Sequence, residues 1–277
     1  MQNLKQIAYK LRQDVVDIII SGKGGHIGGD MSVMEVLVAL YFHEMNVTPE
    51  NFGTASHDHF VMSKGHSVES LYAVLAAKGF FPREQVLKEF SHFGSLFIGH
   101  PNNKLPGIEM NSGALGHGLP VAVGMAIAEK MNKSSNRVYV VMGDGEQAEG
   151  SVWEGAMSGA NYHLDNLCAV VDRNRLQISG STEDVMALDD LAAKWASFGW
   201  HVISVDDGND IDQLIAAFDE AKATKGKPTV LIANTIKGKG SSVMENKANW
   251  HHKVPNAEEY QQIMADLKAQ EAAAAAK

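Results

Sequence analysis

Short apolar segments alternate with helix-like segments along most of the 277-residue chain. An apolar segment at 58–63 is followed by the polar letters KGH and then by a helix-like stretch at 67–79. The same order recurs, with further apolar segments at 137–145, 166–174, 201–210 and 228–240. Strands that are separated by helices form βαβ units, and these build a parallel sheet with helices on both faces. The pattern therefore predicts an α/β fold. No linker or composition break divides 1–277, which favours a single domain.

Two helices are predicted before the first strand, and one long interval departs from the strand–helix pattern. Apolar residues recur at helical spacing from Leu4 to Ile18, which predicts a first helix that ends at SGKGG, 21–25. Ser32 is placed to cap a second helix over 33–45. The interval 80–118 is long, glycine-rich and irregular, and long ordered loops in such folds often carry function.

Composition excludes several classes of protein. The formal net charge of −9 argues against a nucleic-acid or anionic-membrane partner, because both reward clustered Lys and Arg. The single cysteine, Cys168, rules out an internal disulfide and lies in an apolar run, where a buried and inert thiol is expected. Charges interrupt the N-terminal segment, which predicts no signal peptide, and no uninterrupted apolar stretch approaches the length that spans a bilayer. We therefore predict a cytoplasmic protein.

Oxygen-bearing side chains follow two successive predicted strands. Asp144 lies between Gly143 and Gly145 at the end of one strand, and Asn174 follows the next strand. Ligands of parallel α/β sheets bind beyond the carboxyl ends of the strands, and Mg²⁺ prefers oxygen ligands completed by phosphate and water. The two glycines would let the backbone approach a diphosphate beside a helix N-terminus. A tight turn in which Asp144 caps the next helix is the simpler alternative for GDG alone.

The GDG triplet with an asparagine 30 residues after its aspartate resembles the thiamine-diphosphate motif. Nearly all of the chain resembles the N-terminal, diphosphate-binding domain of transketolase. This resemblance implies thiamine diphosphate and Mg²⁺, or Ca²⁺ or Mn²⁺ in its place, as cofactors. It implies a metal site made by Asp144, Asn174 and the main-chain carbonyl of Leu176. Gly145 would contact the diphosphate.

Histidines in glycine-bearing loops agree with this resemblance, because imidazole can donate, accept or exchange protons near neutral pH. By resemblance, His26 in GGHIGG and His100 in GHP would bind or polarise a sugar. His66 in SKGH would face the cofactor. The remaining cofactor and catalytic positions implied by the resemblance are Gly113 and Leu115 in NSGALGHG, and His251 in WHHK.

Several positions depart from the family pattern. His117 stands where many members have glutamine, so we leave it out of the site. The doubled histidine of WHHK leaves open whether His251 or His252 is the functional one. Asp30 stands where serine is common, near the expected substrate channel, and leaves the sugar specificity open. Lys237 and Lys239 are phosphate neighbours or solvated loop lysines.

The resemblance covers only the first part of a full transketolase. It therefore implies a partner chain, a C-terminal transketolase subunit with the pyrimidine-binding and C-terminal domains, most simply in an α₂β₂ assembly. An exposed hydrophobic face would be the structural counterpart of that partner. The implied reaction is the transfer of a two-carbon ketol unit from a ketose, or ketose phosphate, to an aldose acceptor.

Other functions are compatible with the same residues. The chain could belong to another split thiamine-diphosphate enzyme, similar to deoxyxylulose-phosphate synthase or to a two-oxoacid dehydrogenase. It could also be a non-catalytic binding subunit that keeps only the fold. The histidine set and SKGH favour transketolase over the dehydrogenase, and the intact Asp144 and Asn174 pair argues against a non-catalytic role.

Overall fold

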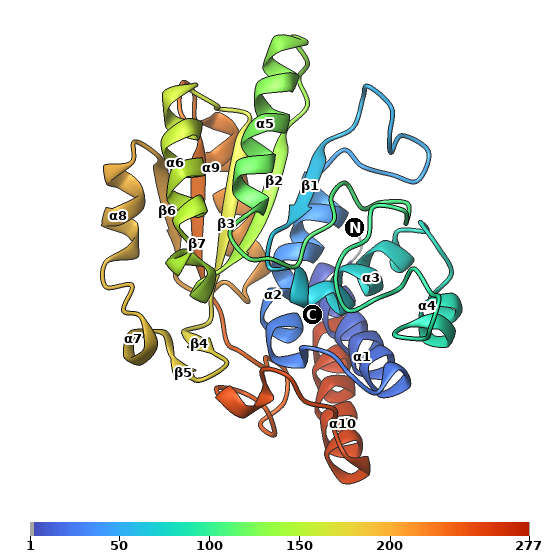
Figure 1. Cartoon of the computed structure of the whole chain (residues 1–277). Coiled ribbons are helices and arrows are strands. Elements are labelled where there is room, and N and C mark those ends of the chain that lie inside the picture. The colour runs from blue at the N-terminus through green and yellow to red at the C-terminus, as the bar shows by residue number, and fades with distance from the viewer. Residues whose placement is uncertain (1–2, 277) are drawn as a thin grey trace.

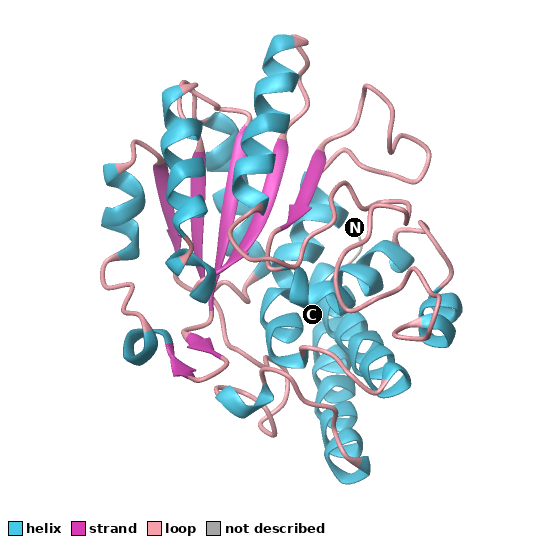
Figure 2. Ribbon diagram, viewed as in Figure 1, coloured by secondary structure: helices cyan, strands magenta, loops and turns pink. Residues whose placement is uncertain are grey.

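The predicted strand segments form one parallel sheet in the computed structural model, which describes residues 3–276 (Figure 2). The strands are β1 (His59–Met62), β2 (Val138–Gly143), β3 (Leu167–Arg173), β6 (His201–Val205) and β7 (Thr229–Asn234). Their order across the sheet is β1-β2-β3-β7-β6, and every neighbouring pair is parallel. A small antiparallel pair, β4 (Leu176–Gln177) and β5 (Gly180–Ser181), lies outside this sheet. The predicted α/β fold is confirmed.

Helices cover both faces of the sheet (Figure 1). The helices are α1 (Leu4–Gly22), α2 (Ile27–Ala39), α3 (Val68–Ala77), α4 (Arg83–Glu89), α5 (Gly118–Met131), α6 (Gly150–Asn161), α7 (Thr182–Val185), α8 (Leu191–Ser197), α9 (Ile211–Ala223) and α10 (Ala257–Ala275). Tyr139 and Val141 of β2 point into the core with α1, α2, α3, α9 and α10. Val140 and Met142 point into the core with α5, α6 and α8. This alternation along one strand is why both faces of the sheet are buried.

Helix α1 has the ends that the sequence predicts. The Asn3 side chain accepts the backbone N–H of Gln6 at 3.1 Å, which caps the first turn. Lys23 adopts the left-handed conformation, with φ at 55°, and the helix ends there. Helix α10, which packs against α1, begins with a capping box between Asn256 and Glu259.

The predicted start of the second helix is wrong. Helix α2 begins at Ile27, and a π-helical turn at 40–44 continues it. Ser32 is therefore inside the helix and caps nothing, and its hydroxyl donates to Asp172 at 2.6 Å. Gly28 and Gly29, which suggest a loop in the sequence, are in the first helical turn. Close packing explains the first of them, because a Cβ atom on Gly28 would approach the Trp250 carbonyl oxygen to 2.6 Å.

The irregular interval 80–118 contains helix α4 and then a long loop that reaches the carboxyl ends of β1 and β2. Within this loop the Ser112 hydroxyl donates to the carbonyl of Met62, the last residue of β1. Between residues 3 and 276, no helix combines the length and the apolar character that crossing a membrane would require.

Candidate active site

A pocket of about 440 Å³ lies at the carboxyl ends of β2 and β3. All of the site residues predicted from the sequence line it, except His100. They are His26, His66, Gly113, Leu115, Gly143, Asp144, Gly145, Asn174, Leu176 and His251. His100 lies beside this lining, with its ring 3.2 Å from the position that a Cβ atom on Gly113 would take. Segments far apart in the sequence thus converge where parallel α/β sheets bind ligands.

Asp144 is buried at the end of β2, and backbone geometry fixes its carboxylate. It accepts the backbone N–H groups of Gly145 at 2.8 Å and Arg175 at 2.5 Å. The first of these contacts makes Asp144 the cap of a short 3₁₀ helix, so the turn interpretation of GDG also describes the structure. Burial and the neighbouring Asp172 carboxylate raise the pKa of Asp144.

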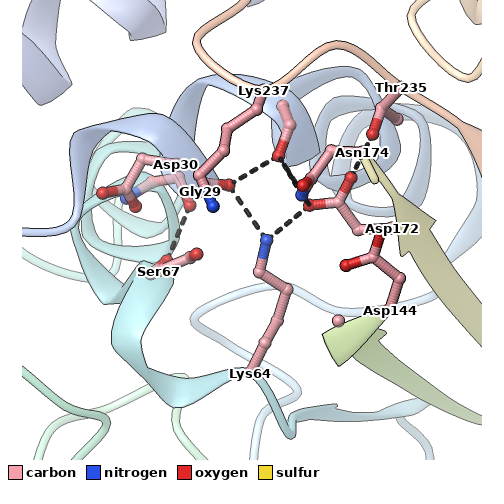
Figure 3. Close-up of polar contacts among 12 residues, drawn as sticks. Gly29, Asp30, Lys64, Ser67, Asp144, Asp172, Asn174, Thr235 and Lys237 are labelled. Atoms are coloured by element: carbon pink, nitrogen blue, oxygen red, sulfur yellow. Dashed lines mark hydrogen bonds and ion pairs between the residues drawn. The ribbon is translucent and has the colours of Figure 1, made fainter. Parts of the chain in front are cut away.

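Asn174 follows β3 and lines the pocket together with Asp144, and both are labelled in Figure 3. Its side-chain oxygen accepts the N–H of Leu176 at 3.1 Å, so the side chain is oriented. An ionised carboxylate offers about four acceptor positions and an amide oxygen about two, so Asp144 and Asn174 both keep acceptor capacity. The donor set of a carboxylate, an amide and a main-chain carbonyl fits a hard divalent cation such as Mg²⁺.

Glu146 joins the GDG turn to the glycine-rich loop that precedes α5. One of its oxygens accepts the N–H of Gly116 at 2.8 Å and the hydroxyl of Ser63, and the other accepts the N–H of Gly143 at 2.9 Å. The side chain is 1% exposed, and burial raises its pKa. A single side chain therefore sets the spacing of two loops that border the pocket.

Lys64, which lines the pocket, forms a buried ion pair with Asp172, which does not line it (Figure 3). The Lys64 ammonium also donates to the carbonyl of Gly29 at 3.0 Å, while Asp172 accepts the hydroxyls of Ser32 and Thr235. Burial alone would raise the pKa of Asp172, but the Lys64 ammonium and these hydrogen bonds hold it below the ordinary value. The pair holds β1, α2, β3 and the end of β7 in one arrangement.

Sequence reasoning missed Lys64, Asp172 and Glu146. Lys64 lies within the SKGH motif and Glu146 directly follows GDG, so adjacency to the motifs was the available signal. Asp172 is an acidic residue that ends an apolar strand, which is the same pattern that points to Asp144.

Imidazole rings surround one end of the pocket. The His26 ring centroid lies 5.3 Å from that of His66, 5.5 Å from that of His251 and 6.3 Å from that of His100. Burial lowers the pKa of His26 to about 4 and that of His251 to about 3, and it also lowers the pKa values of His66 and His100. The four rings are therefore neutral at pH 7, and each can donate one hydrogen bond and accept another.

Lys237 reaches the pocket from the loop after β7. Its ammonium donates to the Leu176 carbonyl and to Nδ1 of His251, both at 2.9 Å. Within the described residues no carboxylate pairs with it, and burial lowers its pKa to about 8. A desolvated ammonium that faces a pocket suits an anionic group such as a diphosphate. Lys239 does not line the pocket.

The contact with Lys237 distinguishes the two adjacent histidines. Since an ammonium can only donate, His251 accepts at Nδ1 and carries its proton on Nε2. His251 lines the pocket, whereas His252 packs edge-on against the His26 ring at 4.6 Å without lining it. These placements favour His251.

Asp30 is placed differently from the sequence interpretation. Its carboxyl group is fully buried, accepts the N–H of Ser70 at 2.8 Å and does not line the pocket. Glu69 is buried beside it, and burial raises the pKa values of both carboxyl groups. Asp30 is thus beneath the loop that carries His26, where it does not contact the pocket. His117 is exposed, in keeping with its omission from the site.

Comparison with known proteins gives the same classification as the pocket. A family model described as "Transketolase, thiamine diphosphate binding domain" matches residues 4–273. The chain is 50% identical over 267 residues to an apulose-4-phosphate transketolase subunit of Phocaeicola vulgatus, covering 96% of this chain and 94% of that one. It is 42% identical over 245 residues to the 6-deoxy-6-sulfo-D-fructose transketolase subunit SqwG of Clostridium sp., covering 88% of each.

Among solved structures, transketolase from Campylobacter jejuni superposes with a TM-score of 0.91 at 26% identity. The match covers 99% of this chain and 46% of the Campylobacter chain, so this chain spans less than half of that protein.

Fold and pocket together define a thiamine diphosphate binding domain. The chain belongs to the transketolase family. It is a transferase subunit, as are the two relatives that it matches over most of their length. The sequence prediction of a transketolase N-terminal subunit is confirmed. The relatives favour neither a dehydrogenase-like nor a synthase-like protein.

Proposed function

We propose that this chain is the diphosphate-binding subunit of a two-chain transketolase. Its single domain binds thiamine diphosphate and Mg²⁺, and the assembly transfers a two-carbon ketol unit from a ketose phosphate to an aldose phosphate. The observation that carries this proposal is the convergence of Asp144, Asn174, Lys237 and three neutral histidines, His26, His66 and His251, on one pocket. A family member that is 50% identical over almost its whole length is itself named as a transketolase subunit.

Asp144, Asn174 and the Leu176 carbonyl would hold the metal ion, which ties the cofactor diphosphate to the ends of β2 and β3. Lys237 supplies a further positive charge to the same anion. Gly145 brings its backbone against the pocket, where a Cβ atom would lie 2.6 Å from the Gln177 side-chain oxygen. When bound, thiamine diphosphate supplies the electron sink for cleavage of the ketose carbon–carbon bond.

The histidines orient the sugar. Because His26, His66, His100 and His251 are neutral at pH 7, they donate hydrogen bonds to carbonyl oxygens and accept them from hydroxyl groups. A diphosphate bound nearby would raise the pKa values of these histidines towards 7, since an anion favours the charged form of imidazole. Proton exchange with the substrate would then become easier.

The proposal includes a partner chain that carries the pyrimidine-binding and C-terminal domains, in an α₂β₂ assembly. Exposed apolar side chains on this chain suit such a partner. Val121 of α5 is 38% exposed, Met157 of α6 is 55% exposed and Ile178 beside the pocket is 69% exposed. Two relatives of this chain are named as apulose-4-phosphate transketolase subunits, and we propose this sugar phosphate as the first substrate to test.

Calorimetry with Mg²⁺ and thiamine diphosphate on this chain, on its partner and on the pair tests the proposal. We expect tight binding only by the pair. Asp144→Asn should abolish binding, whereas Asp206→Asn, a change at an exposed aspartate outside the pocket, should leave it unchanged. Normal cofactor affinity in Asp144→Asn would refute the site. Decarboxylation of pyruvate by the active pair, without ketol transfer, would refute the reaction.

A further inference from the structure

Two histidines and two glutamates gather at the end of β1 that lies away from the pocket. His59 begins β1, whereas the pocket residue Lys64 follows the end of that strand. His57 precedes the strand, Glu109 comes from the long loop before α5, and Glu129 is in the last turns of α5. None of these four residues lines the pocket. The cluster is therefore a feature apart from the cofactor site.

Both histidines face the same carboxylate oxygen. Nε2 of His57 lies 2.9 Å from Oε1 of Glu109, and Nδ1 of His59 lies 3.0 Å from that oxygen. The two ring centroids are 4.5 Å apart. Only 4% of the His57 side chain, 16% of the His59 side chain and 15% of the Glu109 side chain are exposed. The convergence is thus mostly shielded from solvent.

The other nitrogen of each ring also faces an oxygen that can only accept. Nδ1 of His57 donates to the Thr54 carbonyl at 2.8 Å, and Nε2 of His59 donates to Oε1 of Glu129 at 3.1 Å. A neutral imidazole carries one N–H, and these outer contacts use it. The inner nitrogens then present lone pairs to the Glu109 oxygen. These inner contacts need either two further protons, on the rings or on the carboxyl groups, or a shared cation.

This arrangement has the features of a metal site. Histidine ligands commonly donate their second N–H to a carboxylate or a backbone carbonyl, which fixes the tautomer, and here Glu129 and Thr54 accept those N–H groups. Ligand atoms around a tetrahedral Zn²⁺ lie roughly 3.3 Å apart, a few tenths of an ångström more than the two distances from the ring nitrogens to the Glu109 oxygen. The ligand atoms of His57, His59 and Glu109 all lie within 4.8 Å of one another.

We propose that His57, His59 and Glu109 bind a divalent transition-metal cation, with Zn²⁺ the best match to two imidazoles and one carboxylate. Water would take the fourth position. The cation would replace the two extra protons and would connect the loop before β1, the start of β1 and the loop that precedes α5.

The proposed role is structural. The loop that Glu109 anchors continues to Gly113 and Leu115 in the pocket, and Ser112 within it is hydrogen-bonded to β1. Binding of the cation to the folded chain stabilises it by mass action, and the loop is the segment most directly restrained. Metal binding at one end of β1 would thus help to position a cofactor loop at the other.

The first test locates the metal. Crystals of the full chain, freed of metal with a chelator and soaked in Zn²⁺, should show an anomalous peak between His57, His59 and Glu109 at the zinc absorption edge. A peak confined to the histidines of the pocket would overturn the proposal. So would the absence of any peak at millimolar Zn²⁺, which would show that the rings are a protonated, hydrogen-bonded pair.

The second test measures affinity by competition with a chromophoric chelator. Glu109→Gln keeps the side-chain shape and should abolish high-affinity Zn²⁺ binding, and Glu129→Gln should weaken it about 10–100-fold by freeing the His59 ring. His163→Gln, at an exposed histidine elsewhere, and His251→Gln, in the pocket, should not change it. Retained affinity in Glu109→Gln would refute the ligand set. Circular dichroism checks that variant's fold, and His59→Gln replaces it if it does not fold.

Discussion

The ion pair between Lys64 and Asp172 offers a direct test of how the site is held together. The two side chains are 1% and 0% exposed, so neither charge can be solvated once its partner is lost. Asp172→Asn keeps an oxygen for the donors on the carboxylate but removes the negative charge. It leaves a buried ammonium that keeps hydrogen-bond acceptors, such as the Gly29 carbonyl, but has no counter-charge.

The expected loss is large for a substitution that preserves shape. Removal of one partner of a buried ion pair costs about 3–5 kcal/mol, because the other charge is left uncompensated. Since the unfolding entropy is about 2.1 cal/mol/K per residue, this loss corresponds in a 277-residue chain to a fall in melting temperature of about 5–9 °C. Thr235→Val is the matched control, since it removes one neutral donor to the same carboxylate, at a cost of about 1.5 kcal/mol.

Urea unfolding followed by far-ultraviolet circular dichroism at neutral pH measures both variants. A double variant with Lys64→Met and Asp172→Asn should be less destabilised than the sum of its single changes, because neither buried charge remains. The reasoning fails if Asp172→Asn costs no more than Thr235→Val. It also fails if the two changes of the double variant are additive.

Three further outcomes are expected. Gly118→Ala should destabilise the chain by about 1–3 kcal/mol, because its Cβ would lie 2.3 Å from the Cβ of Ser63. Gly124→Ala, in the same helix, meets open space and should stabilise the chain by about 0.5–1 kcal/mol. Urea unfolding measures both. Burial raises the pKa of Asp30 to about 6, so the free energy of unfolding of the wild-type chain falls as pH rises from the ordinary carboxyl pKa through that value. Asp30→Asn should flatten this dependence between about pH 4 and pH 7. An unchanged slope of unfolding free energy against pH would contradict the buried carboxyl pair. In the two-chain assembly, His251→Gln should lower kcat/KM more than His252→Gln, and equal losses would remove the distinction drawn from the pocket lining.

The parts of the fold that the sequence predicts are those set by local pattern. Buried parallel strands are continuous apolar runs, so all of the expected strand segments contain a strand. Helix α5 was missed because its first turns, with Gly118 and Pro120, look like a loop. Proline is compatible with a first helical turn, where backbone N–H groups have no partner within the helix. The start of α2 was missed for a similar reason, since its two glycines look like a loop but pack closely in a helix.

The candidate site likewise contains residues that the sequence predicts and residues whose roles depend on tertiary packing. Strand ends point to Asp144 and Asn174, whereas the other metal and cofactor positions follow from the resemblance to transketolase. All of these positions line one pocket. The pairing of Lys64 with Asp172 depends on residues 108 positions apart. A lysine in a polar loop looks solvated, and its burial follows only from tertiary packing. Tertiary packing also decides that Asp30 is buried away from the pocket and that His100 lies outside the pocket lining.

The position of Glu146 has a practical consequence for the design of chimeric transketolases. One carboxylate spans the GDG turn, the start of α5 and the end of β1, so these three segments behave as one transferable unit. Grafting the glycine-rich loop of a relative without its matching serine and glutamate would leave a buried carboxylate with unmatched donors. Exchange experiments that seek a new substrate range should therefore move Ser63, Gly116 and Glu146 together.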